Sequence, residues 1–172
     1  MRKVGDWKNA ILVQAFKHWP WLADRWARHH QFIEGKDISW APPRKPLRES
    51  SIAMVTTAGV HLKSQTPFNM EDPDGDATFR PFPSDVNKAD LTITHKYYDH
   101  SAADRDINVV LPIDRLRELR DEGIIGGIAP TLYSFMGHID GPHLKILMEE
   151  TAPQVAELLV RDEADAVFLT PA

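Results

Sequence analysis

The sequence predicts an α/β fold in which a mostly parallel, Rossmann-like sheet carries helices on both faces, preceded by an N-terminal helical arm. Short apolar runs rich in β-branched residues alternate with helical patterns, and each run ends in a polar or Pro-containing loop. Strands that alternate with helices favour right-handed βαβ units and a parallel sheet. The length of 172 residues suits one such domain without a disulfide or metal to stabilise it.

The N-terminal quarter differs from the rest, because all five tryptophans lie within residues 1–40. Asp6 could cap a short helix, and Pro20 suits the first turn of a second helix. The aromatic face of such a helical arm packs either on its own domain or on a partner subunit. Residues 41–50 contain three prolines and form an extended connector, and residues 51–172 form the α/β domain.

Five short apolar runs are the expected strands of the domain. Each could deliver a loop at its carboxyl end, as buried parallel strands do. They span residues 52–57, 91–95, 108–111, 124–129 and 166–169. Residues 64–90 show no clear period and are expected to form a long loop of functional importance.

Helices are expected between these strands. Asp114 can cap a helix that Gly123 ends. Residues 142–161 have an apolar face at helical spacing, but Pro153 would break one long helix. Thr151 and Gln154 could form a capping box, so two helices are expected, the second starting at Thr151.

Composition excludes several classes of protein. The formal charge of −5 provides no basic stripe for a nucleic acid, and no apolar run approaches the roughly 20 residues of a membrane-spanning helix. The N-terminus has no apolar segment typical of a secretory signal, so a cytoplasmic location is expected. The absence of cysteine removes thiolate chemistry from residues 1–172 themselves.

Ligands of open α/β sheets bind at the carboxyl ends of the strands. The polar residues expected there therefore define a candidate small-molecule pocket. They are Thr56, Thr57, His95, Tyr98, Asp99, His100, Asp106, Asn108, Tyr133 and His138.

The densest polar cluster contains His95, Asp99 and His100, and three interpretations of it remain open. Imidazole and carboxylate groups could bind zinc or iron, although the spacing fits no specific metal motif. The histidines could instead act as acid and base, with a carboxylate orienting a ring. All three residues could also serve turns and loop hydrogen bonds. Asp106 and Asn108 are similarly typical of turns.

Several motifs in order resemble the selenoprotein B subunits of the glycine, sarcosine, betaine and D-proline reductases. The resemblance covers most of residues 50–172, and the segments at 58–61 and 78–80 are nearer to the D-proline branch. It rests on residues 55–63, 78–83, 95–99, 106–108, 112–119, 122–125 and 133–137.

In that family, the strand similar to residues 165–170 leads into a selenocysteine or cysteine. The resemblance therefore implies that the redox residue follows Ala172, for example at a UGA codon read as a stop. The domain would then be incomplete at its C-terminus, and the 172-residue form would be inactive alone.

The resemblance also implies a reaction. A selenolate or thiolate would cleave a C–N bond of a small amine or amino acid, with electrons from a dithiol or a redox protein. His95 or His100 would protonate the departing nitrogen and Asp99 would orient the ring. The pocket would be lined by Thr56, Thr57, Tyr98, Asp106, Asn108, Tyr133 and His138.

The same resemblance implies other reductase subunits as partners, an oligomer, and a pyruvoyl group on another subunit that activates the substrate. A second interpretation keeps the fold without catalysis. The chain would then be a small-molecule-binding or assembly subunit, with or without a His/Asp metal site.

Overall fold

The computed structural model describes residue 11, residues 14–29 and residues 41–172. The chain divides into two compact units, which are described separately. The smaller unit contains residues 1–42 and Lys96–Asp99, and the larger unit contains Pro43–His95 and His100–Ala172. In the part of the chain that the structure describes, no helix is long and apolar enough to cross a membrane.

The smaller unit contains helix α2 (Pro20–His29), which begins at the proline that the sequence predicts as a helix start. The peptide N–H of Leu22 donates to the carbonyl of Trp19 at 2.9 Å. Trp19 and Trp21 are exposed. The prediction of a helix capped by Asp6 lies outside the described residues.

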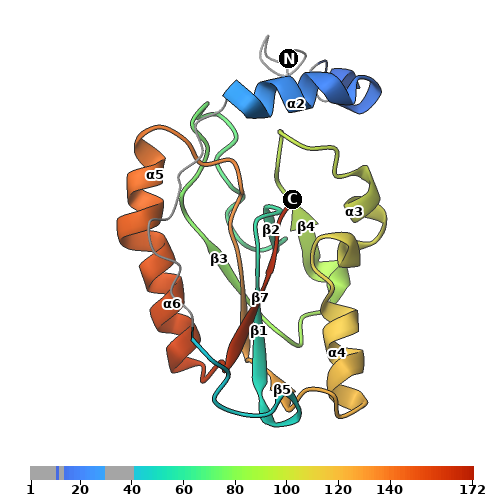
Figure 1. Cartoon of the computed structure of the whole chain (residues 1–172), viewed down its shortest axis with the longest axis vertical. Coiled ribbons are helices and arrows are strands. Elements are labelled where there is room, and N and C mark those ends of the chain that lie inside the picture. The colour runs from blue at the N-terminus through green and yellow to red at the C-terminus, as the bar shows by residue number, and fades with distance from the viewer. Residues whose placement is uncertain (1–10, 12–13, 30–40) are drawn as a thin grey trace. The chain divides into compact units, whose positions relative to one another are not determined.

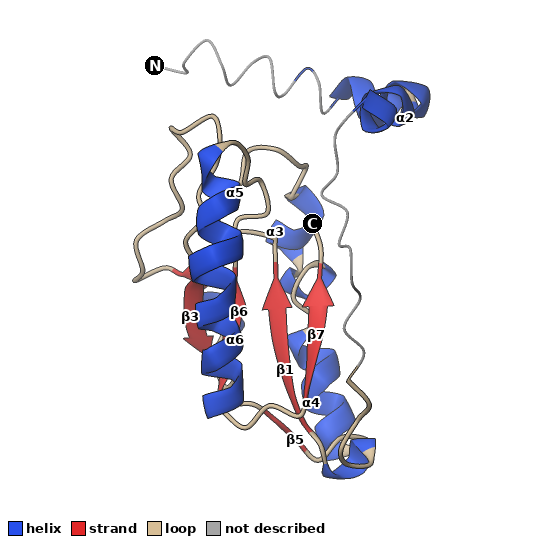
Figure 2. Cartoon of the chain, turned by 60° about the vertical axis from the view of Figure 1, so that its left-hand side comes forward, coloured by secondary structure: helices blue, strands red, loops and turns tan. Residues whose placement is uncertain are grey.

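The main sheet of the larger unit is built around β1 (Ser51–Thr56). One edge of β1 pairs in parallel with β7 (Ala166–Thr170), and the other pairs in parallel with β5 (Gly127–Ile128) and β6 (Thr131–Ser134). β3 (Arg80–Pro83) adds an antiparallel strand beyond β6. This arrangement confirms a mostly parallel sheet, with β1 as its central strand (Figure 2).

β5 and β6 form one interrupted strand along β1. Ser51 is paired with Gly127, whereas Val55 is paired with Tyr133, so the register shifts by two residues between the two pairs. The interruption contains Pro130, which has no N–H to donate to the ladder.

Two of the five predicted strands do not join this sheet. β4 (Leu91–Ile93) pairs antiparallel with β2 (Val60–Leu62) in a separate two-stranded sheet. The prediction of a strand at 108–111 was wrong, because Ile107–Val109 form a 3₁₀ turn in which the Asp106 carboxylate accepts a hydrogen bond from the N–H of Asn108. The predicted long loop contains β3, whose two prolines are tolerated because it is an edge strand.

Helices cover both faces of the sheet. Figures 1 and 2 show α5 (Pro142–Ile146) and α6 (Ala152–Arg161) on one face, and α4 (Ile113–Asp121) on the other, with α3 (Ser101–Arg105) above α4. Gly123 follows α4 with φ of +70°, which confirms its predicted role as the helix stop. The residue preceding α4 is Pro112, so Asp114 is not the N-cap.

A π-helical turn, η4 (Leu147–Thr151), joins α5 to α6. Pro153 lacks the N–H that would continue the α-helical pattern, and the N–H of Ala152 bonds instead to the carbonyl of Leu147. Thr151 directly precedes α6, which confirms the predicted boundary of the second helix. The predicted capping box does not form, because Thr151 has helical dihedrals and makes no side-chain cap hydrogen bond.

The core between the sheet and α6 is aromatic. Val55, Tyr133, Phe135 and Val155 form its buried centre. Phe79 packs against Tyr133 and Phe135, with ring centroids 6.1 and 5.9 Å apart. This packing fixes β6 against α6, and therefore fixes the loop that follows β6.

Candidate functional site at the carboxyl edge of the sheet

The carboxyl ends of β1, β6 and β7 meet at one edge. The N–H of Thr57 donates to the carbonyl of Thr170 at 3.0 Å, and the N–H of Phe135 donates to the carbonyl of Thr56 at 2.9 Å. The end of β4 joins them, since the N–H of Thr94 donates to the carbonyl of Gly59 at 2.9 Å. The loops after four strands are thus tied together, as the sequence analysis expects of a binding edge.

Gly59 allows this close approach. Its φ is +69°, and a β-carbon there would lie 2.4 Å from the carbonyl oxygen of Thr94. Only glycine fits without shifting the backbone. His95 follows Thr94 in the chain. The close approach of Gly59 to Thr94 therefore also determines the backbone position of His95.

His95 and His100 lie in the loop after β4, His138 lies in the loop after β6, and the three histidines interact electrostatically. Burial, reinforced by the charges of His138 and His100, lowers the pKa of His95 to about 4, against the opposing hydrogen bond with the Met136 backbone. His95 is therefore neutral at neutral pH. It therefore does not hold a proton ready to donate at that pH.

His100 and His138 are each oriented by an oxygen. The Nδ1 atom of His100 lies 2.8 Å from an Asp104 carboxylate oxygen. The Nε2 atom of His138 lies 2.9 Å from the carbonyl oxygen of Pro73. A carbonyl only accepts, so Nε2 of His138 carries the hydrogen.

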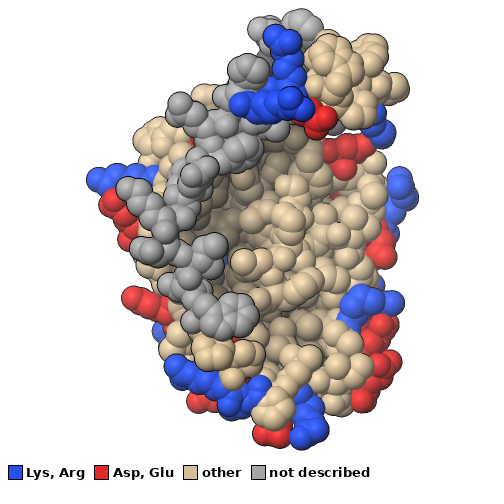
Figure 3. Space-filling view, viewed as in Figure 1, with Lys and Arg blue, Asp and Glu red and all other residues tan. Residues whose placement is uncertain are grey.

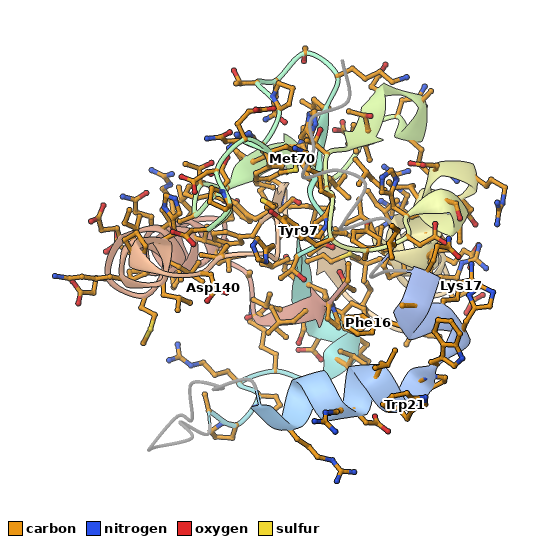
Figure 4. All side chains as sticks on the ribbon, turned by 90° about the horizontal axis from the view of Figure 1, so that it is seen from above. Phe16, Lys17, Trp21, Met70, Tyr97 and Asp140 are labelled. Carbon is orange, nitrogen blue, oxygen red and sulfur yellow. The ribbon has the colours of Figure 1, made fainter. Side chains whose placement is uncertain are left out.

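The carboxylate that contacts a candidate histidine is thus Asp104, which the sequence analysis missed. The spacing of His100 and Asp104 could have indicated this contact, because side chains four residues apart on a helix lie close together. Asp99 and Tyr98 belong to the smaller unit, where an Asp99 oxygen lies 3.2 Å from Nζ of Lys17. Figure 4 labels Lys17 and also Tyr97, a neighbour of Tyr98 in the same unit.

Thr56 and Thr57 have different surroundings. The buried Thr56 hydroxyl donates to the carbonyl of Val110 at 3.0 Å and accepts from the N–H of Ala58. The Thr57 hydroxyl accepts from the N–H of Ala172 at 3.2 Å. Thr56 therefore holds the loop in place, whereas Thr57 contacts the residues that follow β7.

Asp106 and Asn108 form a network at the start of α4. Asn108 donates to Asp106 and to Asp114 at 2.8 Å each, and its amide oxygen accepts from the N–H of Asp114 at 3.0 Å. Lys88 pairs with the Asp114 carboxylate. Hydrogen bonds from Asn108 hold the pKa of Asp106 below its usual value. These contacts agree with the turn interpretation of Asp106 and Asn108.

A cavity of about 300 Å³ lies beside this network, within the larger unit. Its lining includes Asp104, whose carboxylate also contacts His100. The other lining residues come from β4 and from the segments around it, and include Lys88, Thr92, Arg105 and Asp106.

Tyr133 lies in the aromatic core rather than among the histidines. Its hydroxyl lies 3.1 Å from a carboxylate oxygen of Asp162, just beyond the end of α6. Burial and the nearby Asp162 charge raise the pKa of Tyr133. In the described part of the chain, no group of three His, Cys, Asp or Glu side chains is placed to hold a metal ion.

The edge geometry can be compared with known proteins. The family model described as glycine/sarcosine/betaine reductase selenoprotein B matches residues 23–172. The chain belongs to this selenoprotein B family. No solved structure matches the chain.

Curated relatives of this selenoprotein B chain are named as reductase subunits. The D-proline reductase subunit gamma of Acetoanaerobium sticklandii is 40% identical over 131 residues, which cover 76% of this chain and 52% of the relative. The glycine reductase complex component B subunit gamma of Symbiobacterium thermophilum is 34% identical over a match that covers 75% of this chain and 30% of the relative. The betaine reductase complex component B subunit beta of Peptoclostridium acidaminophilum is 34% identical over a match that covers 58% of this chain and 23% of the relative. The chain thus spans between about a quarter and about half of the length of these relatives.

Proposed function

We propose that the chain is part of a reductase subunit that cleaves a C–N bond of a small amine or amino acid. Family membership and the names of three relatives support the proposal that the chain is part of a multi-subunit reductase. The 40% identity to a D-proline reductase subunit makes D-proline the first substrate to test, followed by glycine, sarcosine and betaine.

The observation that carries this proposal is the position of the end of β7. The backbone of Thr170 and that of Ala172 both bond to Thr57, at the edge that also holds His95. A residue delivered from this end of β7 therefore enters the histidine-lined edge. Residues 1–172 contain no cysteine, and in this proposal a selenocysteine or cysteine of the complete subunit follows Ala172.

A selenolate or thiolate there would supply the nucleophile that displaces the nitrogen from carbon. One thiol of a dithiol would then attack the selenium or sulfur, and the carbon would leave with the bonding electron pair and take up a proton. The second thiol would complete the disulfide and regenerate the selenolate or thiolate. The residues of this chain fit that group, because neutral His95 would accept a hydrogen bond from a selenol or thiol there. The nitrogen leaves with the bonding electron pair and needs a proton. His100, oriented by Asp104, is the donor in this proposal.

This assignment modifies the roles expected from the sequence, in which Asp99 orients a histidine. Thr57 and His138 complete the edge that faces the substrate. The natural complex would supply the electron donor and, where the substrate is activated as a Schiff base, the pyruvoyl group on another subunit.

The test uses the complete subunit within its isolated complex. C–N cleavage of each substrate is followed by mass spectrometry with a dithiol present, before and after alkylation of selenols and thiols. We expect alkylation to abolish turnover and His95→Gln to lower it about 100-fold or more. His143→Gln is the matched control, because His143 bonds to Asp72. Turnover that survives alkylation, or equal rates for the two variants, would refute the proposal.

A further inference from the structure

The first 42 residues, which we call the aromatic arm, differ in charge from the rest of the chain. The arm contains seven Lys and Arg against four Asp and Glu, a net charge of +3, and all five tryptophans. Residues 43–172 contain 13 Lys and Arg against 21 Asp and Glu, a net charge of −8. One protein thus combines a cationic aromatic segment with an acidic domain.

The described part of the arm exposes large apolar side chains. Ile11, Trp19 and Trp21 are 55, 55 and 60% exposed. A hollow of about 420 Å³ lies beside Ile11 and Trp19 on the helical segment before α2. Two neighbouring exposed tryptophans are unusual on a surface that contacts only water, and tryptophan is enriched at the centres of interfaces.

Cations stand beside these aromatic side chains. Arg25 and Arg28 are exposed on α2, within two turns of Trp21. Lys17, two residues before Trp19, pairs with Asp99 inside the smaller unit and is 61% exposed. A surface of tryptophan anchors flanked by arginine suits an acidic protein surface, which would complement its charge and cover its apolar groups.

We propose that the aromatic arm docks on the acidic larger unit of a second copy of this chain, forming a reciprocal dimer. The net charges of +3 and −8 are complementary, and an arm exchanged in both directions gives a closed twofold assembly. Figure 3 shows Asp and Glu at the margins of the larger unit on the face in view, interspersed with Lys and Arg. This proposal is independent of the reductase activity.

The arm provides its own probe, because every tryptophan of the protein lies in it. Intrinsic tryptophan fluorescence therefore reports only the surroundings of the arm. As protein concentration rises in 50 mM NaCl, we expect a shift of the emission to shorter wavelength together with a mass of twice 19.5 kDa in light scattering. At 500 mM NaCl, where charges are screened beyond about 4 Å, both changes should diminish.

Point variants of the full chain test the anchors. Trp19→Ala with Trp21→Ala, and separately Arg25→Glu with Arg28→Glu, should each weaken dimerisation about tenfold or more. Matched controls are Val160→Ala, an apolar residue 77% exposed on α6, and Lys145→Glu on α5. Both should dimerise as the unchanged chain does.

Circular dichroism of every variant shows whether it folds. A monomeric mass at all concentrations, or dimers equally strong in the arm variants and the controls, would overturn the proposal. Emission that shifts only on adding anionic vesicles or a nucleic acid would also overturn it, because the arm would then have a different partner.

Discussion

The carbonyl oxygen of Thr57 lies only 2.3 Å from the place where a β-carbon on Gly137 would stand. Gly137 also has φ of +91°, in the left-handed region that favours glycine. The loops after β1 and β6 therefore meet at a position where no other residue fits. This contact brings Thr57 and His138 to the same edge.

Gly137→Ala should lower the free energy of unfolding by about 2–4 kcal/mol, because it combines a backbone clash with strain in φ. Two glycines separate these effects in urea denaturation. Gly123 has φ of +70° but open space around its Cα, so Gly123→Ala should cost about 1 kcal/mol from strain alone. Gly127 has open space and no positive φ, so Gly127→Ala should change stability by about 0.5 kcal/mol or less. Equal losses at 137 and 123 would show that the loops have room to separate.

The low pKa of His95 predicts a pH dependence of stability. The folded protein resists protonation of His95 down to about pH 4, whereas the unfolded chain takes up the proton near pH 6.5. The unfolded state therefore binds more protons in this window, so stability falls as pH drops from 6.5 to 4. The loss due to His95 is about 1–2 kcal/mol after allowance for partial solvent screening.

Urea denaturation at pH 7, 6, 5 and 4 measures this slope. His95→Gln should flatten the slope, and His143→Gln should not. Acidic groups with lowered pKa values, such as Asp76, also lose their stabilising contribution as their unfolded-state carboxylates take up protons near pH 3.8, so the slope between pH 7 and 5 is the part that reports His95. An unchanged slope in His95→Gln would mean that the buried neutral imidazole does not cause it.

Replacing each of two buried threonines by valine should have opposite effects on stability. The Thr56 hydroxyl bonds to Val110, so Thr56→Val should lower the free energy of unfolding by about 1–3 kcal/mol by leaving a buried carbonyl without its donor. The Thr170 hydroxyl is buried and has no hydrogen-bonding partner within the described residues. Thr170→Val should therefore be neutral or stabilising in thermal unfolding. If Thr170→Val destabilises as much as Thr56→Val, the hydroxyl of Thr170 has a partner, such as a bound water.

Asp104 is predicted to act as a positioning residue through His100. In the complete complex, Asp104→Asn should lower kcat about tenfold and shift the pH profile, while KM changes little, because only the proton donor is misaligned. Asp104→Glu should restore part of the activity. Asp85→Asn is the control on an exposed acid outside the site. A pH profile identical to that of the unchanged enzyme would leave Asp104 with a structural role only.

The strongest local patterns were predictable. The runs predicted at 52–57 and 166–169 match β1 and β7 to within one residue at each end, and Gly123 ends α4 as the sequence predicts. Short apolar runs do not encode their partner or direction, so β4 was assigned to the wrong sheet. At 108–111, capping by Asp106 outweighs the β-branched pattern. The prolines of β3 obscured an edge strand.

The site was partly predictable for a similar reason. That His95 and His138 follow strands was visible in the sequence, and the sheet brings their loops together. Which carboxylate meets which histidine depends on side-chain geometry, and the contact of Asp104 with His100 does not follow from the sequence pattern alone. Burial that makes His95 neutral arises only once the loops after β4 and β6 pack together.

The outer edge of β7 affects how this chain can be handled. Within the described residues, β7 pairs only with β1, while Val167, Phe168 and Leu169 are 39, 51 and 68% exposed. An open strand with apolar side chains and no charge is a template for pairing with identical strands in other molecules. The 172-residue form should therefore aggregate through this strand in concentrated solution. The substitution Leu169→Lys should slow this aggregation.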